Sequence, residues 1–148
     1  MKQCEKAAYT VINKCMALKS KESILVLADD PCMDTANILY EICSRRTKHA
    51  ALIQLPVRRS HLVRGVGDML RAMDCAVLLT GETLSHTPER RQACKNGARI
   101  LSMPNMTREM FCRLASMNFE KIARLSQKVS DILSMAHDVH VSHPMAPH

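Results

Sequence analysis

The sequence has few aromatic residues and no long hydrophobic run. It contains no tryptophan, two phenylalanines and two tyrosines among 148 residues, so side chains that stack on the bases of single-stranded nucleic acid are scarce. The longest apolar runs, Ile24–Ala28 and Cys75–Leu79, are far shorter than the roughly 18 residues of a membrane-spanning helix. The first residues show no signal-peptide or transit-peptide pattern. These absences predict a soluble, cytoplasmic protein without a membrane partner, and they disfavour nucleic acid as a partner.

Several chemistry-bearing motifs are missing as well. No G-x-G-x-x-G directly follows a predicted strand and no G-K-[ST] occurs, which disfavours dinucleotide and P-loop nucleotide sites. G-x-S-x-G is absent, and the adjacent residues Ser85 and His86 seldom point their side chains at each other, so a hydrolase triad is disfavoured. No cysteine pair has the C-x2-C spacing of a zinc knuckle. The seven cysteines are scattered and odd in number, which favours reduced, buried thiols over a disulfide framework.

The composition is that of one packed domain with a basic surface. Hydrophobic residues make up 47% of the chain and charged residues 24%, and 21 Lys and Arg outweigh 14 Asp and Glu for a net charge of +7. That charge attracts anionic ligands. The basic residues are spread over the predicted helices and are dense only in Arg46–His49 and Val57–His61. A solvated surface explains this spread, and nucleic-acid binding by Arg45, Arg46, Arg58 and Arg59 is a weaker hypothesis.

Short apolar runs alternate with amphipathic segments of helical length, and this alternation predicts the fold. The expected strands are Ser23–Ala28, His49–Leu55, Asp74–Leu79, Ala98–Met103 and Asp138–Ser142. The expected helices are Lys2–Leu18, Asp34–Arg46, Leu62–Met73, a helix capped by Thr87 and ended by Asn96 and Gly97, a helix from Thr107 to Ala115, and Asn118–Ser134. Repeated strand–helix–strand units predict an α/β fold, a three-layer Rossmann-like sheet, mostly parallel, with helices on both faces.

Ligands of such folds bind beyond the carboxyl ends of the strands. The polar residues expected at that edge are Asp29, Asp30, Arg58, Arg59, Thr80, Glu82, Ser85, His86, Thr87 and Asn105. Within the loop from Thr80 to Pro88, four hydroxyls and one imidazole precede a helix. Thr80, Ser85, His86 and Thr87 are therefore candidates for binding an anion or guiding a substrate. The alternative is structural: Thr87 caps its helix and Ser85 satisfies the turn.

Two further clusters invite a metal hypothesis. Asp29 and Asp30 are suited to a hard cation, although adjacent acids after a strand more often cap the next turn. The tail contains His137, His140, His143, His148 and Asp138, which suit a transition metal by composition. Their spacing does not provide a tetrahedral set, and terminal histidines are often simply mobile. We assign no metal ligand and no catalytic residue to either cluster.

The segment from Leu84 to Phe111, LSHTPERRQACKNGARILSMPNMTREMF, resembles a known family. It looks like the amino-terminal part of the aminopeptidase T-like (leucyl aminopeptidase) metallo-aminopeptidases, a group that also includes dihydroxypyridine ring-cleaving dioxygenases. The matched features are S-H-T at a strand end, an Arg/Lys-rich helix with A-C, then G-A-R-I, M-P and a T-x-E-M-F-like helix. The resemblance extends more loosely upstream through the first expected helix and Ser23–Asp29, and downstream from Asn118 to Pro144.

This resemblance implies an amino-terminal α/β domain, residues 1–117, followed by a linker helix and the first strand of a missing catalytic domain, residues 118–148. The family releases amino-terminal residues from peptides with a divalent metal, zinc, cobalt or similar, held by that missing domain. We therefore expect no cofactor on this chain, a catalytically silent isolated protein, and a homo-oligomer formed through exposed apolar surface. The alternatives are a free-standing α/β module that binds an anion or another small molecule, and the corresponding part of a ring-cleaving dioxygenase.

Overall fold

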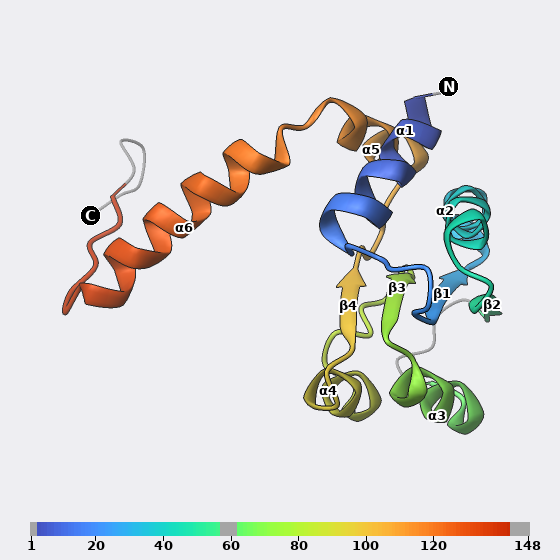
Figure 1. Cartoon of the computed structure of the whole chain (residues 1–148). Helices are drawn as coiled ribbons and strands as arrows, with labels where there is room; N and C mark the ends of the chain where they lie inside the picture. The colour runs from blue at the N-terminus through green and yellow to red at the C-terminus, as the bar shows by residue number, and fades with distance from the viewer. Residues whose placement is uncertain (1–2, 57–61, 143–148) are drawn as a thin grey trace. The chain divides into compact units, whose positions relative to one another are not determined.

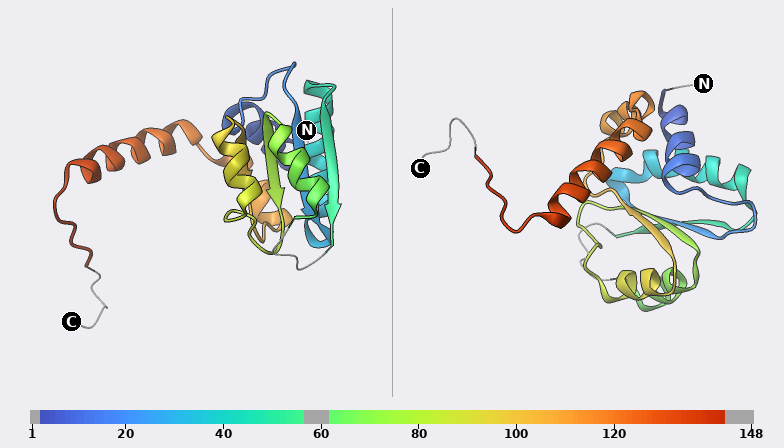
Figure 2. Two further views of the ribbon diagram at one scale, coloured as in Figure 1. Left: turned by 90° about the horizontal axis from the view of Figure 1, so that it is seen from below. Right: turned by 60° about the vertical axis from the view of Figure 1, so that its left-hand side comes forward.

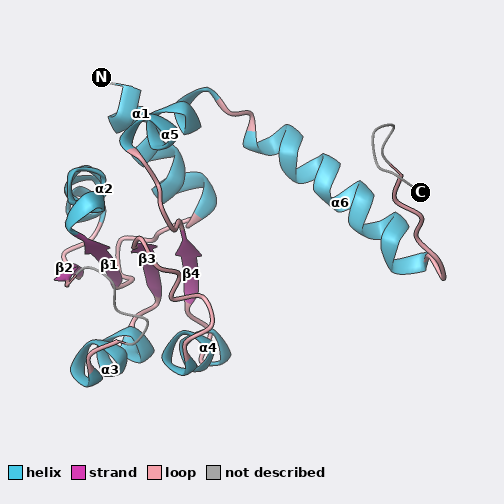
Figure 3. Cartoon of the chain, turned by 180° about the vertical axis from the view of Figure 1, so that it is seen from behind, coloured by secondary structure: helices cyan, strands magenta, loops and turns pink. Residues whose placement is uncertain are grey.

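Four parallel strands form the central sheet of the computed structural model, which describes residues 3–56 and 62–142. The strands are β1 (Ile24–Asp29), β2 (Ala50–Leu55), β3 (Cys75–Leu79) and β4 (Arg99–Ser102). Their order across the sheet is β2-β1-β3-β4, and Figure 3 shows this order from behind. In register, Val26 of β1 lies between Leu52 of β2 and Val77 of β3. The α/β, Rossmann-like class predicted from the alternating pattern is confirmed, with every strand pair parallel.

The two central strands are buried along their whole length, and their residues are apolar up to the final Asp29 of β1, because helices cover both faces of the sheet. All residues of β1 and β3 are buried, as expected of strands inside a parallel sheet. Ile24, Val26 and Ala28 belong to one core, and Leu25 and Leu27 belong to the other. This alternation follows from the two-residue period of a strand. The sheet thus separates two apolar cores.

Helices pack on both faces of this sheet. They precede the first strand, connect each strand to the next and follow the last strand. The helical segments of the domain are α1 (Gln3–Thr10), η1 (Val11–Cys15), η2 (Asp30–Cys32), α2 (Met33–Arg46), α3 (Arg64–Ala72), α4 (Pro88–Lys95), α5 (Arg108–Arg113) and η3 (Leu114–Ser116). Figures 1 and 2 show α3 and α4 side by side on one face, with α1, α2 and α5 on the other. Fully buried Phe111 of α5 packs into the core on its side of the sheet.

Helix ends follow the local sequence rules closely. Thr87 is the N-cap of α4 and Pro88 occupies its first turn. Thr107 caps α5 in the same way, and its side chain accepts a hydrogen bond from the Met110 amide. Gly97 follows α4 with φ of 96°, a left-handed conformation that costs glycine little. The predicted caps are confirmed.

The first predicted helix is shorter and less regular than expected. The α-helix ends at Thr10, and Val11–Cys15 continues as a π-helical turn. Ala17 then adopts φ of 47°, which ends the helical path before Leu18. The buried face of the segment is nonetheless the predicted one, since Ala7, Ala8, Val11 and Ile12 are all buried.

The chain divides into two units, one up to Met117 and one from Asn118 onward. In the second unit, α6 (Phe119–Met135) is a helix capped by Asn118. The expected fifth strand, Asp138–Ser142, does not form, and these residues have no regular secondary structure. A short strand needs a neighbouring strand for its hydrogen bonds, and the second unit contains no other strand among its described residues.

The expectation of reduced cysteines is wrong for one pair. Cys4 of α1 and Cys112 of α5 form a disulfide, although 108 residues separate them in the sequence. The other five cysteines are free. The spacing of the pair gave no sign of this contact because α1 and α5 are brought together only by their packing on the same face of the sheet.

The helices among the described residues include none that is both long enough and apolar enough to cross a membrane.

Candidate functional site

The carboxyl edge of β1 and β3 is the natural binding position of this sheet. From β1 the chain crosses to β2 on one side, whereas from β3 it continues to β4 on the other side. The crossover helices of these two connections, α2 and α4, lie on opposite faces of the sheet. Their divergence leaves a crevice at the ends of the two central strands, where open α/β sheets bind ligands.

Asp29, the last residue of β1, is the central polar group at this edge. Its side chain is almost completely buried, with 3% of the residue exposed. One carboxylate oxygen, Oδ2, accepts a hydrogen bond of 2.6 Å from the amide of Gly81, just beyond β3. The sequence-based interpretation that Asp29 caps the next turn is wrong, since it makes no side-chain cap bond to η2. Asp29 instead connects the ends of two neighbouring strands.

The other carboxylate oxygen, Asp29 Oδ1, is buried without a hydrogen-bond partner among the described residues. The thiol of Cys32 interacts with the same carboxylate. Burial, followed by the negative charge of Asp29, raises the pKa of Cys32 to about 11, while the thiol itself donates to the Met106 carbonyl at 4.0 Å. Because a neutral thiol is only a weak donor, the Asp29 carboxylate retains unused capacity to accept a hydrogen bond. Such an unsatisfied buried acceptor costs about 1–3 kcal/mol.

Gly81 leaves space beside this carboxylate. A Cβ atom at Gly81 would lie 3.2 Å from Asp29 Oδ2 and 3.7 Å from Asn105 Oδ1. Asn105 itself adopts a left-handed conformation with φ of 53°, which asparagine tolerates better than most residues. The backbone amide of Asn105 donates a 3.1 Å hydrogen bond to the backbone carbonyl of Thr80. The loops after β3 and β4 are thereby held against each other.

An open pocket of about 420 Å³ lies at this edge. Its lining comes from the segments after β1, β3 and β4: Pro31, Cys32, Gly81, Asn105, Met106, Thr107 and Arg108. The walls combine apolar Pro31 and Met106 with polar Asn105 and cationic Arg108. Arg108 is exposed and lies 3.7 Å from the exposed carboxylate of Asp34, a pair that solvent screens strongly. We call this the Asp29 pocket: Asp29 is not one of the lining residues, but its carboxylate accepts the hydrogen bond from the amide of Gly81, which is one of them.

The sequence-predicted anion site uses its hydroxyls to build its own loop. Thr87 Oγ1 donates to the carbonyl of Leu84 and accepts from the Arg90 amide. Thr80 Oγ1 donates to the carbonyl of Glu82, and Ser85 Oγ bonds to Ser102 Oγ at 3.0 Å.

The His86 side chain is exposed. Thr80, Ser85, His86 and Thr87 therefore lie in one loop, with three hydroxyls engaged internally, and anion binding there stays a prediction. Arg90, in the first turn of α4, keeps its Nε buried without a hydrogen-bond partner among the described residues.

The remaining predicted edge residues are distributed differently. Asp30 Oδ1 accepts a short hydrogen bond from Gln54 Nε2 of β2, and the Glu82 side chain is exposed. Arg58 and Arg59 lie outside the described residues. Sequence reasoning named Asp29 and Asn105 but missed Cys32, Gly81 and Arg108. The available signal was the position of Gly81, a glycine two residues beyond a buried strand.

No group of three or more His, Cys, Asp and Glu side chains suited to a metal ion occurs in residues 3–56 and 62–142. His137 and His140 belong to the irregular segment after α6, where both are exposed. His143 and His148 lie outside the described residues. The tail histidines thus make no ligand set within the part of the chain that the structure describes.

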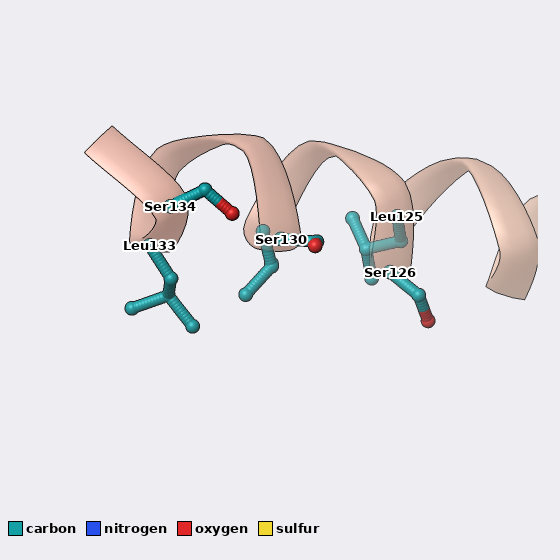
Figure 4. A pocket seen from close by; sticks show the side chains of 6 residues that line it. Leu125, Ser126, Ser130, Leu133 and Ser134 are labelled. Carbon is teal, nitrogen blue, oxygen red and sulfur yellow. The ribbon is translucent and has the colours of Figure 1, made fainter. Parts of the chain in front are cut away.

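The second unit has a different surface feature, a side of α6 that carries both apolar and serine side chains. Figure 4 shows Leu125 and Leu133 together with Ser126, Ser130 and Ser134 along one side of the helix. A shallow depression over these residues and Val129 has a volume of about 590 Å³. Every residue of α6 except Phe119 is exposed, so the depression is a helix surface and not an enclosed site.

Comparisons with known proteins identify a fold and no family. No protein-family model matches the chain, and no curated protein matches it. Among solved structures it is similar to 2,5-dihydroxypyridine dioxygenase from Pseudomonas putida KT2440, with a TM-score of 0.54 and 19% sequence identity. The match covers 69% of this chain and 33% of that one, so the chain spans about a third of the length of the enzyme.

These comparisons overturn the identification as an aminopeptidase T-like metallo-aminopeptidase. No family model or curated protein of that kind matches, and the solved structure that does match is a dioxygenase. The motifs from Leu84 to Phe111 misled because a cap, a helix, a glycine turn and a strand recur wherever a βαβ unit is built. At 19% identity the likeness shows the fold alone: the chain has the α/β architecture of part of a dihydroxypyridine dioxygenase.

Proposed function

We propose that the chain is a small-molecule-binding α/β domain whose ligand occupies the Asp29 pocket. The observation that carries this proposal is the Asp29 carboxylate, buried at the crevice between β1 and β3 with Oδ1 unpartnered among the described residues. A structural carboxylate at this depth normally has both oxygens satisfied. An acceptor left over at the usual binding position of the fold favours a ligand that donates hydrogen bonds.

The lining limits the ligand further. Asn105 Oδ1 adds a second acceptor close to the same point, and Pro31 and Met106 supply apolar contact. A volume of about 420 Å³ is in the range of pockets for small organic molecules, roughly 300–1,000 Å³. The expected ligand is a small polar organic compound with hydroxyl or amino donors facing Asp29 and Asn105.

The proposal is tested by nuclear magnetic resonance on the full chain labelled with 15N. Three probes are titrated separately: ethanolamine as a cation, glycerol as a neutral polyol and acetate as an anion. We expect ethanolamine or glycerol to shift the amide signals of Cys32, Gly81 and Met106, and acetate to leave them in place. Shifts confined to other segments, or none with any probe at 50 mM, would contradict a site at Asp29.

Asp29→Asn is the matched variant for this experiment. Asparagine keeps an oxygen for the Gly81 amide but removes the charge that attracts a donor. We expect at least a tenfold loss of affinity for the best probe, the equivalent of about 1.4 kcal/mol. Asp34→Asn is the control, because it removes the same charge from an exposed carboxylate beside Arg108, whereas Asp29 is buried and bonded to the lining residue Gly81.

A second candidate function is the role of the corresponding part of a ring-cleaving dioxygenase, favoured by the fold likeness to 2,5-dihydroxypyridine dioxygenase. In this candidate the domain shapes one side of a substrate path, and the isolated chain is catalytically silent. The probe is 2,5-dihydroxypyridine itself, which offers hydroxyl donors to Asp29. Shifts at Gly81 and Cys32 that Asp29→Asn abolishes would support the role. Unperturbed spectra, or loss of the ring absorbance on incubation with the chain alone, would argue against it.

A further inference from the structure

The disulfide between Cys4 and Cys112 joins a buried residue to a partly exposed one, whereas three of the five free cysteines are buried, Cys15 is exposed and Cys94 is partly exposed. Cys4 is buried, with 7% of the residue exposed, whereas Cys112 is partly exposed and lines a surface groove of about 490 Å³. Cys32, Cys43 and Cys75 are buried in the domain core. Cys112 thus borders the groove, and the groove gives access to the disulfide from the side of that residue.

The groove is rich in charged side chains of α5. Its lining consists of Gln3, Arg108, Glu109, Cys112 and Arg113, so two guanidinium groups flank the cysteine and one carboxylate opposes them. Among the described residues Arg108 forms an exposed pair with Asp34, which solvent screens, and Arg113 is exposed. Cations beside a cysteine favour its thiolate and attract anionic reagents.

We propose that Cys4–Cys112 is an exchangeable disulfide and that this groove admits an anionic low-molecular-weight thiol of the glutathione class to Cys112. The thiolate of glutathione attacks Cys112 Sγ, the bond to Cys4 breaks, and Cys4 leaves as a thiolate that takes up a proton. In the resulting mixed disulfide Cys112 Sγ is bonded to the glutathione sulfur. A second glutathione thiolate attacks that glutathione sulfur, and glutathione disulfide and the Cys112 thiolate are released. Two glutathione molecules are oxidised and one protein disulfide is reduced.

The direction of attack follows from access and charge. Attack on Cys112 is open to solvent through the groove, while the Cys4 sulfur lies on the buried face of α1. Arg108 and Arg113 draw the carboxylates of glutathione toward the groove, and they stabilise the Cys112 thiolate that is released in the second step. Phe111 anchors α5 to the core independently of the disulfide, so reduction loosens α5 without unfolding the domain.

The first test locates the disulfide in the full chain purified without reductant. The protein is denatured in excess iodoacetamide, then reduced and treated with N-ethylmaleimide, and its peptides are analysed by mass spectrometry. We expect maleimide on Cys4 and Cys112 and carbamidomethyl on the other five cysteines. A second sample is incubated with glutathione disulfide before denaturation, so that a reduced pair can oxidise. Carbamidomethyl groups on all seven cysteines of this sample would overturn the proposal.

The second test measures the rate of reduction of the native protein by glutathione and by dithiothreitol, a neutral dithiol, at low salt. Arg108→Ala/Arg113→Ala is expected to slow reduction by glutathione about fivefold and to leave the dithiothreitol rate unchanged, since roughly 1 kcal/mol of charge attraction is lost. The control Arg124→Ala/Lys128→Ala removes the same charge from exposed positions of α6 and should change neither rate. Equal glutathione rates for the parent and the Arg108/Arg113 variant would show that the groove does not receive an anionic thiol.

A third variant tests the sign of the charge effect. Glu109→Gln removes the acidic group among the described lining residues of the groove, so reduction by glutathione should become faster than in the parent. A slower reaction would contradict anionic attraction in the groove.

Discussion

Arg99 donates two hydrogen bonds to the carboxylate of Glu22, 77 residues earlier in the chain, with a closest contact of 2.7 Å. Its Nε donates to the carbonyl of Met16, and Nη2 also contacts the sulfur of Cys75. Arg99 thereby connects the start of β4 to the segments that precede β1 and begin β3. This cluster at the amino edge of the sheet holds the scaffold, whereas the Asp29 pocket lies at the opposite edge.

Stability is expected to fall at acid pH through this edge. Hydrogen bonds from Arg99 and then from the Lys19 amide lower the pKa of Glu22 below 4.5. The Ser23 amide and then its hydroxyl lower the pKa of Asp74 below 3.8. Each carboxylate contributes stability above its unfolded pKa, and that contribution is lost as the pH falls through the lowered folded value. Urea midpoints should therefore decrease between pH 5 and pH 3.

Glu22→Gln tests the same contact directly. The variant is expected to lose about 1 kcal/mol at pH 7, because charge-assisted hydrogen bonds contribute more than this but Arg99 is partly exposed. Its acid-induced loss should be shallower than that of the parent. Glu82→Gln, at an exposed side chain, is the control and should match the parent. An unchanged acid profile in Glu22→Gln would show that the Arg99 contact does not set it.

Two glycines of α3 should respond in opposite directions to alanine. A Cβ at Gly65 meets nothing within 4 Å, whereas a Cβ at Gly67 would lie 2.6 Å from Glu89 Cγ of α4. Gly65→Ala is expected to stabilise the protein by about 0.4–1 kcal/mol, since it reduces the entropy of the unfolded chain. Gly67→Ala should destabilise it, because α3 and α4 must separate or Glu89 must move. Thermal midpoints measured side by side check both signs, and a stabilised Gly67→Ala would contradict the close α3–α4 packing.

The fold was predictable because its signals are local. The apolar runs Ile24–Ala28 and Cys75–Leu79, the Thr87–Pro88 helix start and the Gly97 helix end each depend on neighbours within a few positions. The fifth strand failed because Val139 and Val141 alternate with polar residues as a strand does, yet alternation supplies no partner strand. The predicted end of the first helix was wrong because Ala17 adopts a positive φ. The sequence has no glycine or asparagine at this position that would have indicated such a conformation.

The candidate site was only partly predictable because it depends on contacts between distant segments. The rule for strand ends located Asp29 and Asn105, but the Asp29–Gly81 hydrogen bond joins residues 52 positions apart. The Cys4–Cys112 disulfide joins residues that are still farther apart, at 108 positions. The loop of His86 attracted the functional interpretation because it is rich in hydroxyls, and the structure shows that three of these hydroxyls bond within the domain.

Variants at Thr87 and His86 should distinguish a structural role of this loop from anion binding. Thr87→Ala is expected to cost about 1 kcal/mol of stability, since it removes the α4 cap. His86→Ala should leave stability unchanged, because this side chain is exposed. Calorimetry with inorganic phosphate then decides the binding question. Micromolar affinity that His86→Ala abolishes would establish an anion site, and the absence of heat in the parent would remove this hypothesis.

Four apolar residues form a strip along α6, and we expect this strip to cause self-association. Ile122, Leu125, Val129 and Ile132 are all roughly half exposed or more, and their alternating spacing of three and four residues places them on one side of the helix. Burying such a strip against the same strip of a second copy removes apolar surface from water.

Light scattering on the full chain from 5 to 200 μM should show a mass that rises from monomer to dimer. Val129→Glu places a charge in the middle of the strip and should keep the chain monomeric throughout, since a buried, unpaired charge is strongly disfavoured. Gln127→Glu adds the same charge to the polar side of α6 and should dimerise like the parent. A parent that stays monomeric at 200 μM, or a Val129→Glu variant that dimerises as the parent does, would show that α6 does not bind a second copy of itself.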